Sequence, residues 1–287
     1  MTRMRLIAIT PARDEEKFLP RLIASMTGQT LKPERWIIVD DGSTDASAEI
    51  IDEAAMRHPW IDPQHLPSGR PRAPGGESVI MDYLPAEVWR EHDAILRLDA
   101  DLSFRPDFVE LLGTEFYRDS ALGIAGATLY EPEGAAWREV RSPSFHTRGA
   151  VKMYSRGCFE AIGGLSAGLG WDTLDEALAM MHGFKSRSFR HIRAYHHRPQ
   201  GAAGGHLRAN RAAGRAAYNV GYHPLFLVLR ALRRSLWWPP MVGGAMMLAG
   251  YFEGYLRHAQ KIAPPELVKF IRRQQMRRLL LMESVWR

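Results

Sequence analysis

Short apolar runs alternate with helix-spaced apolar positions over the first hundred residues. The runs are typical of buried strands, whereas Phe18, Leu22 and Met26 are spaced like one face of a helix. We expect strands over 5–10, 35–40 and 93–99, a short strand within 60–66, and helices over 15–26, 46–57 and 78–90. This alternation predicts an α/β fold with a mostly parallel central sheet and helices on both faces.

The pattern is more mixed between residues 100 and 200. A helix is expected over 106–117, strands over 122–130, 148–155 and 188–197, and a helix over 170–184 that ends at Gly183. In sheets of this class, ligands bind outside the carboxyl ends of the strands. The loops that follow the early strands are therefore where chemistry is expected.

The last third of the chain differs in charge. Residues 201–287 contain 14 Lys and Arg against 3 Asp and Glu, whereas residues 1–200 contain 24 against 29. Such a basic segment indicates an anionic partner, either a membrane surface or a nucleic acid. We therefore expect a catalytic α/β domain over 1–200 and a basic amphipathic helical region over 201–287.

An uncharged run of 18 residues, 235–252, lies within the basic region and contains Pro239 and Pro240. A membrane-spanning helix needs about 20 residues, and these prolines interrupt the run. We expect a buried or interfacial helix here. Trp237 and Trp238, set among arginines and leucines, suit a membrane interface. The alternative is a soluble helical subdomain that forms a homodimer contact.

The single cysteine, Cys158, excludes an internal disulfide and fits a reducing compartment. The N-terminal residues run apolar for only a few positions before charges appear, which is not the pattern of a signal peptide. We expect a cytoplasmic protein, held peripherally at the cytoplasmic face of the membrane.

Two aspartates, Asp99 and Asp101, end the apolar run that begins at residue 93. Strand positions two apart share a face, so each charge raises the cost of ionising the other. A cation relieves this repulsion, and carboxylates suit Mg²⁺ or Mn²⁺ shared with a phosphate group. The alternatives are a simple polar strand end and a paired-carboxylate glycosidase, which normally takes its two acids from separate elements.

Two other loops also follow expected strands. In IIVDDGSTD, Asp40 and Asp41 could hydrogen-bond a base or ribose, although an Asx turn alone could explain them. In SGRPRAPGGES, Arg70 and Arg72 are suited to phosphate. The sequence has neither GxxxxGK[ST] nor GxGxxG, so a P-loop or a dinucleotide-binding Rossmann site is unsupported.

Four motifs taken together resemble glycosyltransferase family 2, over roughly residues 5–200. They are ITPARDEEKFL, IIVDDGSTD, ILRLDADLSF and GCFEAIGGLSAGLGWDTLDEALAMMHGF. The resemblance implies a GT-A fold, a nucleotide-sugar donor, a divalent metal and inversion at the anomeric carbon. It makes a UDP-sugar the default donor. With the membrane-suited tail, it favours a saccharide or lipid-linked acceptor.

The resemblance also implies roles for the donor side of the site. The residues that match the nucleoside pocket are Thr10, Pro11, Ala12, Glu15, Asp41 and, less directly, Asp40. Asp101 matches the metal ligand, and Asp99 matches a contact to the sugar or ribose and to the metal's water shell. Arg70, Arg72 or Lys152 would assist at the diphosphate.

The catalytic base is implied at Asp172, where the family carries a Glu-Asp pair and this chain has Trp171 in place of the glutamate. Asp175 is the alternative base. A downstream histidine often completes the metal site in related enzymes, which points to His197 or its neighbour His196. The base would take a proton from an acceptor hydroxyl, which attacks from the face opposite the diphosphate.

Two other classes remain as alternatives. A metal-dependent nucleotidyltransferase would usually carry a glycine-rich basic signature after the first strand, where this chain reads TPARDEE. A nucleic-acid-binding protein could use the basic tail, but no recognised nucleic-acid motif supports it and the apolar faces of the tail argue against it. We expect no nucleic-acid partner.

Overall fold

The computed structural model describes residues 4–69, 83–198, 205–236 and 240–286. Five residues named above fall outside these ranges: Arg70, Arg72, Trp237, Trp238 and Pro239.

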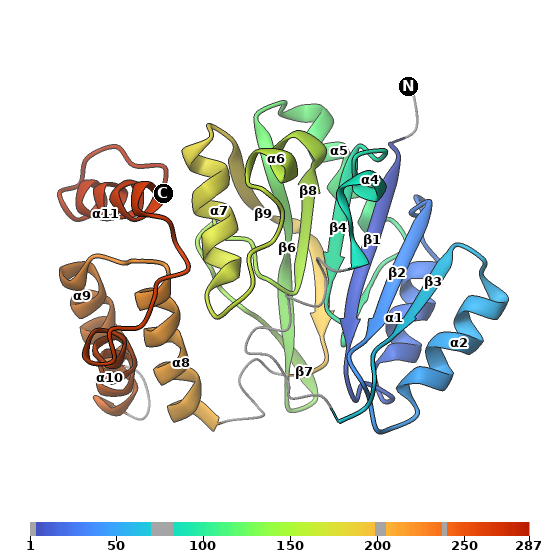
Figure 1. Cartoon of the computed structure of the whole chain (residues 1–287), viewed down its shortest axis with the longest axis horizontal. Helices are drawn as coiled ribbons and strands as arrows, with labels where there is room; N and C mark the ends of the chain where they lie inside the picture. Colours follow the sequence, from blue (N-terminus) through green and yellow to red (C-terminus); the bar gives the residue numbers. More distant parts are fainter. Residues whose placement is uncertain (1–3, 70–82, 199–204, 237–239, 287) are drawn as a thin grey trace.

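A single mixed sheet runs through the molecule (Figure 1). Its strands are β1 (Leu6–Ala12), β2 (Arg35–Asp40), β3 (Ile61–His65), β4 (Ala94–Leu98), β5 (Leu102–Phe104), β6 (Leu122–Glu133), β7 (Ala136–Glu139), β8 (Val151–Ser155) and β9 (Lys185–His196). Among the described residues their order is β3-β2-β1-β4-β8-β6-β9-β5, with β7 paired to β6.

The sheet divides into two parts by strand direction. Strands β3, β2, β1 and β4 are all parallel to one another. Beyond β4 the pairs β4–β8, β8–β6 and β9–β5 are antiparallel, and only β6–β9 is parallel. The expected parallel sheet is therefore confirmed for the first part only, because the strands of the second part pair mainly antiparallel.

Helices cover both faces of the sheet, as expected (Figure 1). The strand β1 is buried on both sides: Leu6 and Ala8 face one core, and Ile7 and Ile9 face the other. On the first face lie α1 (Leu19–Thr27), α2 (Ser47–Arg57) and α5 (Phe108–Arg118), and on the second α4 (Ala86–Trp89), α6 (Arg156–Ala161) and α7 (Trp171–Met181). A continuous apolar run is what a strand covered on both faces requires.

Four helices form a bundle beside α7, at one end of the molecule (Figure 1). They are α8 (Gly205–Asn219), α9 (Pro224–Ser235), α10 (Val242–Leu256) and α11 (Pro265–Leu279). The helices α8 and α10 cross closely: a Cβ on Gly214 would lie 1.9 Å from the Met247 carbonyl oxygen. The bundle shares a hydrophobic core with Leu174 and Ala177 of α7, so it supports the helix that begins at Trp171.

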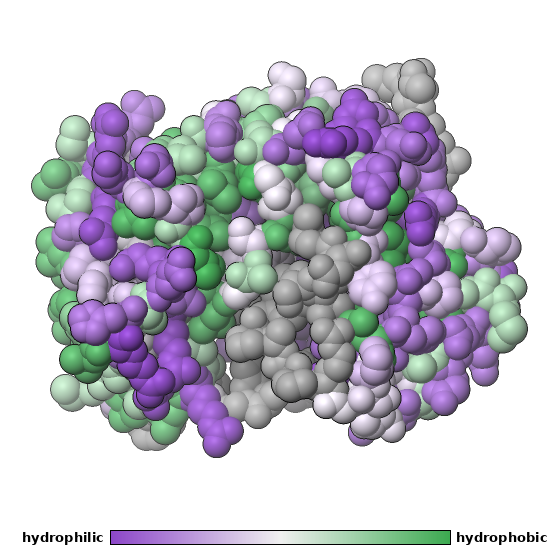
Figure 2. Space-filling view, viewed as in Figure 1, coloured by the Kyte–Doolittle hydropathy of each residue, from purple (hydrophilic) through white to green (hydrophobic). Residues whose placement is uncertain are grey.

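The bundle exposes apolar surface. Figure 2 shows hydrophobic side chains along the left edge of the molecule, where α9, α10 and α11 lie in Figure 1. Within the described parts of the chain, no helix combines the length and the apolar character needed to cross a bilayer. Most of the uncharged run at 235–252 lies in α10, which is partly buried against α8 and α9.

Candidate functional site

The end of β4 is tied to two other strands of the sheet. The Asp99 N–H donates to the Ala150 carbonyl at 2.9 Å, just before β8. The His197 N–H donates to the Asp101 carbonyl at 2.9 Å, just after β9. Because these bonds come from both sides, the two aspartates are held between β8 and β9 at one edge of the sheet.

Three side chains converge at this edge: Asp99, Asp101 and His196. One possible ligand atom from each lies within 4.8 Å of the others. The Oδ1 atom of Asp101 lies 3.1 Å from Nε2 of His196. Two neighbouring ligands at about 2.1 Å from an octahedral ion are about 3 Å apart, so this spacing fits one cation between them.

Hydrogen bonding supports the same interpretation. Asp101 Oδ1 and His196 Nδ1 are both buried without a hydrogen-bond partner. Of the two ring nitrogens of His196, Nε2 faces Asp101, whereas Nδ1 lies 3.7 Å from Glu131 Oε1. A metal-bound histidine commonly directs its second nitrogen towards a carboxylate in this way. The donor set therefore fits Mg²⁺ or Mn²⁺, with Glu131 in support of His196.

Electrostatics also favour positive charge at this edge. Burial lowers the pKa of His196, but Asp101, with Asp99 and Glu131, raises it by more, so the pKa lies above its ordinary value. The carboxylates that stabilise a proton on His196 would equally stabilise a cation beside it.

The adjacent histidine, His197, faces the other way. Its Nδ1 lies 3.0 Å from Arg21 Nη1, its Nε2 lies 2.8 Å from Ser103 Oγ, and its ring stacks on Phe18. Consecutive residues of an extended chain point to opposite sides. The structure therefore brings His196, rather than the expected ligand His197, to the aspartates.

The two aspartates have unequal surroundings. Arg97, a buried β4 residue, lies with Nη1 2.6 Å from Asp99 Oδ1 and donates to the Gly149 carbonyl. Arg97 and Asp99 are two apart in the strand and so share a face. Asp99 is thus already partly neutralised, whereas Asp101 faces His196. Arg97 was not among the expected site residues, although an arginine inside the apolar run AILRLD is a signal for one.

Asp172 lies in the first turn of α7, half-buried. The helix is capped by Gly170, which adopts the left-handed region with φ 104°. A Cβ on Gly149 would lie 3.4 Å from Asp172 Cβ. Gly149 is also the residue whose carbonyl binds Arg97, so Asp172 and Asp99 approach each other across one loop. The helix dipole stabilises a carboxylate at this position.

Trp171 forms the wall beside Asp172 and is itself buried. The Arg97 guanidinium lies 5.0 Å from the ring centroid, and the Lys152 ammonium lies 5.2 Å from it. Each is within cation–π range. The ring thus connects the strand that carries Asp99 to the helix that carries Asp172.

Asp175 and Lys152 lie in the core. Lys152 Nζ donates to Asp175 Oδ1 at 2.8 Å and to the Asp172 carbonyl at 2.5 Å, and the Tyr154 hydroxyl also donates to Asp175. Burial raises the pKa of Asp175 to about 6. At 2% exposure its carboxylate cannot meet an acceptor, so the structure does not favour it as the base. Lys152 was expected to assist at the diphosphate, but it is fully buried and its ammonium is directed to Asp175.

The expected donor residues separate into two groups. The Thr10 hydroxyl accepts from Trp36 Nε1 at 3.0 Å inside the core, and Asp40 Oδ1 accepts from the Ser43 N–H at 3.0 Å in an Asx-type turn. These two side chains support the fold. By contrast, the loops after β1 and β2 meet where the Asp41 N–H donates to the Ala12 carbonyl at 2.8 Å.

The second group lies closer to the aspartates. Arg198 pairs with Glu15 and places its Nε 3.7 Å from Asp101 Oδ2. Asp41 Oδ2 lies 3.5 Å from Arg13 Nη1, and Pro11 is a half-buried residue near the end of β1. Glu15 and Asp41 are therefore on the same edge as the possible metal ligands, and Arg198 connects Glu15 to them.

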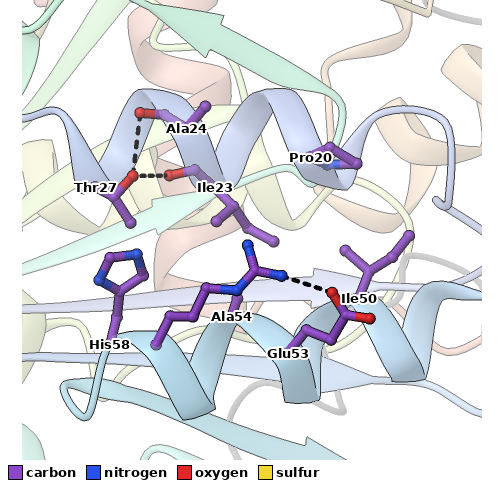
Figure 3. Close-up of a pocket in the computed structure, with 9 residues that line it drawn as sticks. Pro20, Ile23, Ala24, Thr27, Ile50, Glu53, Ala54 and His58 are labelled. Atoms are coloured by element: carbon purple, nitrogen blue, oxygen red, sulfur yellow. Dashed lines mark hydrogen bonds and ion pairs between the residues drawn. The ribbon is translucent and has the colours of Figure 1, made fainter.

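A separate cavity of about 360 Å³ lies between α1 and α2 (Figure 3). It is lined by Pro20, Ile23, Ala24, Thr27, Ile50, Glu53, Ala54, Arg57 and His58. None of the candidate residues lines it, so we do not connect it with the site.

The part of the chain that contains the loops after β1 and β2 matches a known protein family. Residues 7–67 match the family described as Glycosyl transferase family 2. The resemblance to this family is therefore confirmed over this segment. The chain is also 30% identical over 129 residues to the chondroitin synthase of Escherichia coli. That match spans 45% of this chain and 18% of the chondroitin synthase.

Solved glycosyltransferase structures share the fold of this chain. S. aureus TarS 1–349, solved in complex with UDP-GlcNAc, has a TM-score of 0.57 and 16% sequence identity to this chain. The match covers 75% of this chain and 66% of the TarS chain. The mannosyltransferase PcManGT from Pyrobaculum calidifontis, solved with GDP-Man and Mn²⁺, has a TM-score of 0.57 and 16% sequence identity. The match covers 99% of this chain and 77% of PcManGT. The chain therefore has the GT-A fold that the motifs implied.

We predict that Lys152→Met strongly destabilises this fold. The change leaves Asp175 buried without its cation, which typically costs about 3–5 kcal/mol. Denaturant unfolding followed by circular dichroism measures the loss. Lys185→Met, which removes an exposed pair with Asp119, is the matched control and should cost no more than about 1 kcal/mol. Equal losses in the two variants would contradict the assignment.

Proposed function

We propose that this chain is an inverting glycosyltransferase that moves a sugar from a nucleotide-diphosphate donor to an acceptor hydroxyl. The observation that carries the proposal is the convergence of Asp99, Asp101 and His196 at the sheet edge, beside the loops after β1 and β2. The family match over residues 7–67 supports it, since those residues include both loops.

Asp101 and His196 would hold the divalent cation directly, with Asp99 held by Arg97 as the less direct partner. When bound, Mg²⁺ or Mn²⁺ would stabilise negative charge on the departing diphosphate. Two similar structures were solved with this ion: PcManGT with GDP-Man and Mn²⁺, and GalNAc-T7 with UDP, GalNAc and Mn²⁺.

Asp172 would act as the base. It is half-buried rather than enclosed, begins a helix and lies across one loop from Asp99. It would take the proton from the acceptor hydroxyl as that oxygen attacks the anomeric carbon. Inversion then needs no covalent sugar intermediate, and no second carboxylate is needed as a nucleophile.

The nucleoside would lie against the loops after β1 and β2, near Pro11, Ala12, Glu15 and Asp41. We propose UDP as its nucleotide, since TarS and GalNAc-T7 were solved with UDP-containing ligands, while the GDP-Man of PcManGT is the competing choice. The acceptor would be a saccharide or a lipid-linked saccharide.

A panel of nucleotide sugars with and without Mn²⁺ or Mg²⁺ tests the proposed function. We predict metal-dependent hydrolysis or transfer from at least one donor, and a loss of at least about 100-fold in Asp101→Asn because the cation loses its ligand. Asp52→Asn, an exposed aspartate of α2, is the control and should retain turnover. Absence of both turnover and metal-dependent nucleotide binding would refute the proposal.

We predict that Asp172→Asn and Asp175→Asn fail in different ways. Asp172→Asn should keep UDP binding and thermal stability but lose about 10²–10⁴-fold in transfer, the usual contribution of a general base. Asp175→Asn should instead lower the unfolding free energy, because it alters a buried ion pair. Transfer rates and UDP titrations on both variants separate these effects. A folded, inactive Asp175→Asn beside an active Asp172→Asn would reverse the assignment.

A further inference from the structure

Helix α9 carries an exposed row of leucines. Leu225 is 48% exposed, Leu229 42%, Leu232 59% and Leu236, at the helix C-cap, 82%. At about 100° per residue, the four leucines lie within about 60° of one another around the helix. They form one continuous apolar stripe, which we call the leucine stripe.

The leucine stripe is not the side that holds α9 to the protein. Leu227 and Ala231, on the opposite side of the helix, are almost completely buried in the core of the bundle. The packing of α9 is therefore complete without the leucine stripe. Four outward-facing leucines on one helix are more than the isolated apolar residues that ordinary surfaces carry.

Helix α10 extends this apolar surface. It packs on α9 where a Cβ on Gly244 would lie 2.4 Å from the Ala231 carbonyl oxygen. Its exposed positions include Val242, Ala245, Ala249, Phe252 and Leu256, which are apolar and spaced as one helical face; Tyr255, also exposed, lies outside that face. Figure 2 shows hydrophobic surface at the edge of the molecule occupied by these helices.

The chain segment that contains the leucine stripe carries positive side chains and no acidic ones. Residues 177–252 contain no aspartate or glutamate. Arg233 is exposed at the edge of the leucine stripe, and Arg230 is exposed further round the helix, against the Tyr222 ring. An apolar stripe bordered by arginines is the pattern of a helix that lies in the headgroup region of an anionic bilayer.

We propose that the leucine stripe of α9, with the exposed face of α10, docks the protein on an anionic lipid bilayer. The leucines would enter the acyl boundary while Arg230 and Arg233 contact lipid phosphates. The charge pattern disfavours a second copy of the chain, because a two-fold contact would bring arginines against arginines with no nearby acid in the segment.

Docking here would also orient the candidate site. The core of the bundle includes Leu174 and Ala177 of α7, and Asn219 of α8 donates to the Leu169 carbonyl at 3.0 Å, three residues before Asp172. The helices that meet the bilayer therefore support the start of the helix that carries Asp172. A lipid-linked acceptor is the chemistry that such an arrangement would serve; this last point rests on the proposed function, whereas docking itself does not.

Vesicle flotation of the full chain tests the proposal without any sugar transfer. We predict binding to vesicles of phosphatidylcholine with phosphatidylglycerol, weak binding to phosphatidylcholine alone, and weakening with salt. Leu229→Gln/Leu232→Gln should lower the partition coefficient at least about tenfold, because both side chains lose their apolar transfer energy. Arg233→Gln should weaken binding to anionic vesicles only.

Matched controls come from the parts of the molecule outside the bundle. Met56→Gln replaces a methionine that is 77% exposed on α2, and Arg190→Gln replaces an exposed arginine of β9; both should bind vesicles like the wild type. Circular dichroism of each variant checks that it folds.

Three results would overturn the proposal. The first is no binding of the wild type to either vesicle, and the second is equal binding by wild type and the double leucine variant. The third is a dimer, detected by light scattering, that the double variant dissociates; this would assign the leucine stripe to a second copy. Loss of sugar transfer with vesicle binding intact would refute the proposed function and leave docking standing.

Discussion

The repulsion between Asp99 and Asp101 is the constraint around which the candidate site is organised. A strand end forces the two carboxylates onto one edge, and the fold compensates them with groups from separate parts of the chain. Arg97 comes from β4 itself, His196 from the end of β9, and Arg198 from the residues just after β9. Asp101 Oδ1 is buried without a hydrogen bond and lies 3.1 Å from His196 Nε2, so the compensation is incomplete at the point where a cation fits.

A second electrostatic arrangement fixes the other side of the site. Lys152 of β8 binds Asp175 and the Asp172 carbonyl, and so connects the sheet to the first turn of α7. The Trp171 ring packs against both Lys152 and Arg97, and the helical bundle shares a hydrophobic core with α7. Because a buried ion pair is costly to break, the position of Asp172 is tied to the stability of the domain. The candidate base and the candidate metal site are thus parts of one buried network.

The sequence predicted local structure better than long-range pairing. The strand at 35–40 matches β2, and the helix expected over 46–57 matches α2 to within one residue, because apolar periodicity is local. The antiparallel half was missed, because the pairing of β4 with β8 joins residues more than 50 apart and leaves no local signal. The unexpected strand β5 exists only because it pairs with β9.

The same distinction applies to the site. Motif spacing identified Asp99, Asp101 and the loops that meet at Ala12 and Asp41, since each follows a strand that the pattern revealed. Spacing could not choose between His196 and His197, because strand alternation selects one face and only the partner strand decides which face meets the aspartates. Nor could it show that Asp175 is enclosed by Lys152 and Tyr154, a contact between distant segments.

The central claim is that Asp99, Asp101 and His196 together hold a divalent metal. Mn²⁺ binding measured by electron paramagnetic resonance, with UDP present, tests it most directly in the wild type, His196→Gln and His197→Gln. Our account predicts that His196→Gln weakens Mn²⁺ binding at least about tenfold, while His197→Gln, which alters only contacts around Arg21, Ser103 and their neighbours, leaves it near the wild-type value. Normal Mn²⁺ affinity in His196→Gln, or a loss confined to His197→Gln, would contradict it.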